Sequence, residues 1–144
     1  MKLEHVALNV SDPHAIADWY VQNLGMSYAK QSTASPFVTF ISDDSGKMMI
    51  ELYNDPAAGS IPNYAEMNTL LLHVAFVSDD PRADQARLVA AGACTGAGTG
   101  VGASPGSPGA PARLGRAGDE AVVVPVAART PTGHHGRTCP QPCA

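Results

Sequence analysis

The sequence predicts an α+β fold built from two copies of one β-α-β-β-β unit. The first observation is a repeat, because HVALNVSDP at residues 5–13 returns as HVAFVSDDP at residues 73–81 with one residue of slip. The second is the pattern of apolar residues, which alternate in the expected strands and recur at helical spacing between them. A period of about seventy residues is too long for a solenoid and fits two supersecondary units of one small domain.

The first strand is expected over Leu3 to Val10. Alternation places Val6, Leu8 and Val10 on an apolar face suited to packing under a helix. The opposite face is mixed in character and contains His5 and Asn9.

The first helix is expected from Pro13 to Leu24. Asp12 is a favoured N-cap and proline is favoured at the first helical position. Gly25 can supply the left-handed C-cap. The side chains at helical spacing between these ends are Ile16, Trp19, Tyr20, Asn23 and Leu24.

Three further strands complete the first unit, at residues 27–33, 37–42 and 47–54, with turn chemistry between the last two. In the final strand, Ile50 and Leu52 belong to an apolar face, and Glu51 lies on the other face between Met49 and Tyr53. A carboxylate therefore lies in the interior of a strand.

The second copy begins after a linker at residues 56–69. Leu70 to Val77 predicts a strand, and Asp80 caps a helix that opens at Pro81, packs through Leu88 and Val89, and closes at Gly92. The expected domains are thus a first module at 1–55 and a second at 70–127, well matched over 70–93 and divergent over 94–127. Residues 128–144 are expected to be a disordered tail.

Composition excludes several classes of protein. The net charge of -4 and the sequence pI of about 5.6 argue against a nucleic-acid partner. No apolar run is long enough for a membrane span, and no signal peptide precedes the first strand. These features predict a cytoplasmic protein, in which the odd set of three cysteines argues against a disulfide framework.

The composition changes at about Ala93. Every aromatic residue and every Lys, Ile and Met lies before this point, and Gly, Ala, Pro, Thr and Arg dominate after it. Such a segment has little apolar surface to offset its ordering entropy. One hypothesis is that residues from about Cys94 onward are read out of frame from a GC-rich gene. Glu120 to Val126 is the one strand-like run there.

His5, Glu51 and His73 share one kind of position, the less apolar face of a strand whose opposite face is core. Burying a lone imidazole or carboxylate is costly without a partner. Three such residues converging on a metal ion would explain one another. Two imidazoles and one carboxylate suit Zn, Ni, Mn, Fe(II) or Co and leave positions open for substrate or water.

The pattern resembles the vicinal oxygen chelate superfamily, which includes glyoxalase I, extradiol dioxygenases and bleomycin resistance proteins. The resemblance rests on HVALNVSDP with the helix ending NLGM, on MMIELY, and on LLHVAFVSDDP with AAGA. It implies that two βαβββ modules curl into a mixed-sheet cup, and that ligands come from the first and last strands of each module. His5, Glu51 and His73 match these ligand positions.

The second module departs from the family pattern, because it lacks the Asp-Pro-x-Gly turn that precedes the fourth ligand in similar proteins. Glu120 is the candidate fourth ligand, since it follows His73 at a distance similar to that of Glu51 from His5. The resemblance also implies that Glu51 or Glu120 acts as a catalytic base and that the protein is a homodimer. The candidate substrate-binding residues of the cup are Asn9, Phe37, Val38, Met49 and Tyr53.

Three functions follow from this sequence. The first is a metal-dependent lyase, isomerase or dioxygenase acting on a small substrate with vicinal oxygens. The second is a metal-free protein that sequesters a drug in an apolar cleft, similar to bleomycin resistance proteins. The third is a non-functional product with a damaged second module. His5, Glu51 and His73 favour the first over the second.

Overall fold

The computed structural model describes residues 2–64, 67–68, 71–93 and 120–124, the last group as a strand only. These residues divide into two compact units, one up to Asn63 and one from Tyr64 onward. The predicted tail at 128–144 lies outside the described residues. The segment hypothesised to be out of frame lies outside them as well, except for residues 120–124.

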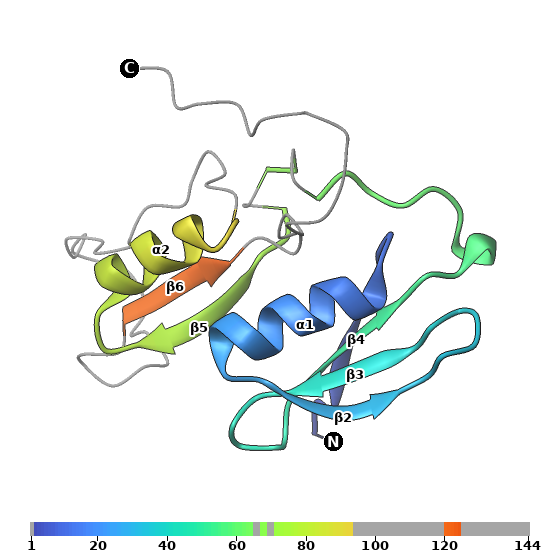
Figure 1. Cartoon of the computed structure of the whole chain (residues 1–144), viewed down its shortest axis with the longest axis horizontal. Helices are drawn as coiled ribbons and strands as arrows, with labels where there is room; N and C mark the ends of the chain where they lie inside the picture. The colour runs from blue at the N-terminus through green and yellow to red at the C-terminus, as the bar shows by residue number, and fades with distance from the viewer. Residues whose placement is uncertain (1, 65–66, 69–70, 94–119, 125–144) are drawn as a thin grey trace. The chain divides into compact units, whose positions relative to one another are not determined.

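The first unit forms the predicted β-α-β-β-β arrangement (Figure 1). A four-stranded sheet has the order β1-β4-β3-β2, with β1 parallel to β4 and the other neighbours antiparallel. Helix α1 lies across one face of this mixed sheet. The elements are β1 (His5–Asn9), α1 (Pro13–Leu24), β2 (Ser27–Gln31), β3 (Thr39–Ser42), β4 (Met49–Tyr53) and the short 3-10 helix η1 (Pro56–Ala58).

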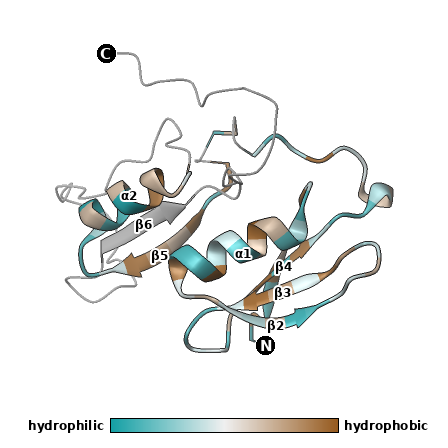
Figure 2. Ribbon diagram, in the orientation of Figure 1, coloured by the Kyte–Doolittle hydropathy of each residue, from teal (hydrophilic) through white to brown (hydrophobic). Residues whose placement is uncertain are grey.

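The core of this unit lies between α1 and the sheet. In β4 the alternation predicted from the sequence holds, since Ile50 and Leu52 are buried and Glu51 is half-buried on the opposite face. In contrast, the edge strand β2 is exposed throughout and is hydrophilic in Figure 2. The other buried apolar residues that the sheet and helix contribute are Leu8, Ile16, Ala17, Trp19, Tyr20 and Ile41.

The repeat is visible in how the two long helices begin. The Asp12 carboxylate accepts a hydrogen bond from the Ala15 amide at 3.0 Å, and Asp80 accepts one from Ala83 at 3.1 Å. Proline occupies the first turn of both helices. Gly25 ends α1 in the left-handed conformation with a φ of 68°, as predicted.

The second unit contains β5 (Val74–Ser78), α2 (Pro81–Ala90) and β6 (Glu120–Val124). Strands β5 and β6 pair antiparallel. Two expectations need correction. The strand begins at Val74 rather than Leu70, because Leu71 is part of a turn in which its amide donates to the Asn68 carbonyl at 2.9 Å. Leu88 packs as expected, but Val89 is 42% exposed.

The observed mixed sheet with a helix across it confirms the predicted fold class. Among the described helices, none has the length and apolar character needed to cross a membrane.

Candidate functional site

The sheet face opposite α1 brings His5 and Glu51 together. Strands β1 and β4 are parallel neighbours in which Ala7 is the register partner of Glu51. Since Ile50 and Leu52 point into the core, Glu51 points to the other face, as does His5. The Nε2 atom of His5 lies 3.3 Å from Oε2 of Glu51.

Two further side chains surround the His5 ring. Phe40, the register partner of Glu51 on β3, meets the ring edge-to-face at a centroid distance of 5.5 Å. Glu4 lies on the far side, where its Oε2 is 2.8 Å from Nδ1 of His5. The side chains of His5 and Glu51 are only 34% and 20% exposed. The imidazole is therefore held between two carboxylates beside an aromatic ring.

The His5–Glu51 pair fits a divalent metal ion. Two ligand atoms that are each about 2.0–2.2 Å from one ion lie about 3.0–3.5 Å apart. The observed separation of 3.3 Å falls within that range, and imidazole nitrogen with carboxylate oxygen is a donor set of Zn and similar ions. Within the described part of the chain, no group of three or more His, Cys, Asp or Glu side chains is placed to hold an ion. The pair alone thus offers two donor atoms, fewer than the three protein ligands that such sites usually have.

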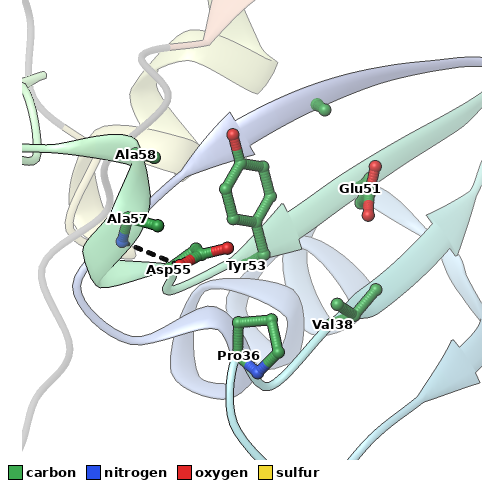
Figure 3. Close-up of a pocket in the computed structure, with 8 residues that line it drawn as sticks. Pro36, Val38, Glu51, Tyr53, Asp55, Ala57 and Ala58 are labelled. Carbon is green, nitrogen blue, oxygen red and sulfur yellow. Dashed lines mark hydrogen bonds between the residues drawn. The ribbon is translucent and has the colours of Figure 1, made fainter.

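A hollow of about 500 Å³ opens next to Glu51 on the same sheet face. Figure 3 shows Glu51 and Tyr53 on β4, with Val38 and Pro36 on one side and the segment from Asp55 to Ala58 on the other. The Asp55 carboxylate accepts a hydrogen bond from the Ala57 amide at 2.8 Å, which fixes the start of η1. The volume of the hollow and its mixture of polar and apolar walls suit a small organic molecule.

The sequence matches the model of one protein family over residues 2–134, and that family is the Glyoxalase/Bleomycin resistance protein/Dioxygenase superfamily. The chain belongs to this superfamily. Comparison with curated proteins gave no match. Among solved structures, the chain is similar to an antibiotic binding protein, TnmS3 from Streptomyces sp. CB03234. The two share 18% identity and a TM-score of 0.47, over 65% of this chain and 73% of that one.

Within this superfamily fold, the residues predicted to bind substrate have different surroundings. Val38 and Tyr53 line the hollow, whereas Asn9, Phe37 and Met49 are not among its lining residues. Asn9 is only 9% exposed, and its side-chain oxygen accepts a hydrogen bond from the Asp55 amide at 3.1 Å. Asn9 thus helps to hold the segment that forms one wall.

Phe37 and Met49, which do not line the hollow, make other contacts. The Phe37 ring packs edge-to-face on His14 at a centroid distance of 6.0 Å. Met49 is half-buried at the start of β4, where it is the register partner of His5.

The second unit contains the other two predicted ligands. His73 directly precedes β5, and Glu120 begins β6. Antiparallel pairing places Glu120 opposite Ser78, five residues beyond His73, which is about 15 Å or more along the strand at 3.4 Å per residue. Two ligands of one ion must approach much more closely than that. The structure therefore does not bring His73 and Glu120 together.

Sequence reasoning missed several residues of the site. Glu4 has no partner that periodicity could reveal, because it is adjacent to His5 in the chain. Pro36, Asp55 and Ala58 line the hollow from loops and a 3-10 helix, where no periodic pattern applies. The one usable signal was Asp55-Pro56, a cap followed by proline that predicts the start of a helical turn.

Proposed function

We propose that this chain is a metal-dependent enzyme of the superfamily that acts on a small substrate with vicinal oxygens. The observation that supports the proposal is the 3.3 Å approach of His5 Nε2 to Glu51 Oε2, on the face that contains the hollow. His5 and Glu51 are proposed as two ligands of the ion, and the ligand role of His73, which directly precedes β5, stays a prediction from the sequence. Because β6 pairs Glu120 opposite Ser78, Glu120 and His73 are not proposed to hold one ion together.

The chemistry would divide between the ion and the protein. A bound divalent ion would act as a Lewis acid toward the substrate oxygens. Glu51 borders the hollow, so its carboxylate can accept a proton from a molecule bound there. Tyr53 and Val38 would contact the substrate, and Asn9 would hold the wall through Asp55. Glyoxalase-like lyase or isomerase activity and dioxygenase activity both fit this arrangement.

Metal content tests the proposal. The full chain, purified without chelators, is expected to contain about one transition-metal ion per site by elemental analysis, and His5→Ala and Glu51→Ala should each lose it. His14→Ala is the matched control, because His14 contacts the Ser32 carbonyl instead of a carboxylate. Wild-type protein without metal, even after reconstitution with Zn, Mn, Ni and Fe(II), would contradict an enzyme of this type.

A second function, binding a small molecule without metal, is favoured by the lining of the hollow. Most of its walls are apolar, Glu51 and Asp55 contribute carboxylates, and none of the described residues that line it is basic. Such a lining favours a neutral or cationic molecule with an apolar body over an anion.

Binding in the presence of excess chelator tests this second function. A cationic aromatic dye should then bind the wild-type chain, and Tyr53→Ala should weaken binding several-fold, whereas an anionic dye of similar size should not bind. Equal binding of the two dyes would contradict it.

A further inference from the structure

We infer that Glu4 is a positioning residue. Its carboxylate selects the tautomer of the His5 ring that presents Nε2 to the site. The contact that carries the inference joins Glu4 Oε2 to His5 Nδ1 at 2.8 Å. It is shorter than the 3.3 Å separation between Nε2 and Glu51 on the opposite side of the ring.

A neutral imidazole has one N–H group, so it donates a hydrogen bond from one nitrogen only. Both neighbouring carboxylates accept and cannot donate, so they compete for this proton, and the shorter contact with Glu4, 2.8 Å against 3.3 Å, favours the proton on Nδ1. Nε2 then carries a lone pair directed to the side where Glu51 lies. A histidine that binds a metal through one nitrogen needs this state, and a carboxylate on the other nitrogen raises the basicity of the ligand.

The backbone holds Glu4 in place. The Glu4 carbonyl accepts a hydrogen bond from the Met49 amide at 3.0 Å, which extends the pairing of β1 with β4 by one residue. Phe40 restricts the ring on another side through its edge-to-face contact. The Glu4 side chain is 69% exposed, so water competes for its oxygens, and the expected effect is moderate.

The tautomer prediction holds with or without a metal, whereas the effect on metal affinity rests on the proposed function. Nitrogen NMR of the metal-free full chain, labelled with ¹⁵N in histidine, reads the tautomer directly at a pH where the rings are neutral. His5 should be protonated at Nδ1. His14 is an internal reference of the opposite kind, because its Nε2 lies 2.9 Å from the Ser32 carbonyl and must donate to it.

Two variants separate positioning from general damage. Glu4→Ala should shift His5 toward the Nε2–H tautomer and leave the His14 resonances unchanged. Glu4→Gln should retain the wild-type tautomer, because its side-chain oxygen can still accept the hydrogen bond. Wild-type His5 protonated at Nε2, or a Glu4→Ala variant with an unchanged tautomer, would overturn the inference.

Titration with Zn²⁺ alone supplies the second readout. Glu4→Ala should weaken Zn²⁺ binding roughly tenfold, at the lower end of the range for such carboxylate partners, and Glu4→Gln should weaken it less. A Glu4→Ala variant that binds Zn²⁺ as tightly as the wild type would overturn the positioning role. If the wild type binds no Zn²⁺, the proposed function fails, and the tautomer measurement alone decides the inference.

Discussion

The imidazole of His5 and the carboxylate of Glu51 face each other across the parallel pairing of β1 and β4, with Nε2 3.3 Å from Oε2. This relationship depends on strand register. A slip of one residue in β4 would turn Glu51 toward α1 and bring Ile50 or Leu52 to the site face. The apolar alternation of β4 therefore specifies both the core and the placement of the carboxylate.

Removing core volume under the site should destabilise the first unit. Leu52 is 1% exposed, so Leu52→Ala is expected to lower the free energy of unfolding by about 2–5 kcal/mol. Leu3→Ala is the matched control, because Leu3 is 67% exposed and its loss should cost less than about 0.5 kcal/mol. Chemical denaturation followed by Trp19 fluorescence measures both changes. Equal losses in the two variants would contradict the described core.

The Tyr28 hydroxyl should lose its proton at an unusually high pH. Although Tyr28 is 40% exposed, partial desolvation of its hydroxyl, followed by the hydrogen bond to Asp18 and the Asp18 charge, raises its pKa from 10.0 to about 12. The hydroxyl donates to Asp18 Oδ1 at 2.6 Å. Because the pKa is higher in the folded state, the stabilisation is complete below pH 10 and is lost as the pH rises through about 12.

Asp18→Asn should lower the pKa of Tyr28, since it removes the negative charge. Tyrosinate absorbance measures this shift, and Tyr28→Phe identifies the transition. A Tyr28 transition at the same pH in wild type and Asp18→Asn would show that the contact with Asp18 is absent in solution.

Filling the hollow should block small molecules without removing a metal ligand. Ala58→Trp adds a large side chain to one wall, away from the His5–Glu51 pair. Ligand affinity, or activity once a substrate is known, should fall at least tenfold, while metal content stays at the wild-type level. Ala86→Trp is the control at an exposed position of α2. Loss of binding in both variants, or in neither, would argue against the hollow as the ligand site.

The sequence predicted the first unit well, because local signals agree there, except that Val6, expected in the core, is 48% exposed. Alternation placed Glu51 opposite Ile50 and Leu52, and Asp12 and Gly25 marked the ends of α1. The start of β5 was placed too early, since apolar residues continue back from Val74 into a turn. Periodicity cannot distinguish a strand from an apolar turn that precedes it.

The site was predictable where residues occupy strands or, like Val38, directly precede one. His5 and Glu51 came together as expected from their positions in β1 and β4. The walls at Pro36, Asp55 and Ala58 come from irregular segments, whose positions depend on tertiary contacts such as the hydrogen bond from the Asp55 amide to Asn9. No local pattern encodes such a contact.

A crystal structure of the full chain grown with Zn²⁺, with diffraction recorded at the zinc absorption edge, tests the central claim most directly. One anomalous peak is expected within about 2.0–2.2 Å of both His5 Nε2 and a Glu51 carboxylate oxygen. Nδ1 of His5 should still donate its hydrogen bond to the Glu4 carboxylate. An empty site between His5 and Glu51 at saturating Zn²⁺, or an ion bound elsewhere, would contradict the account.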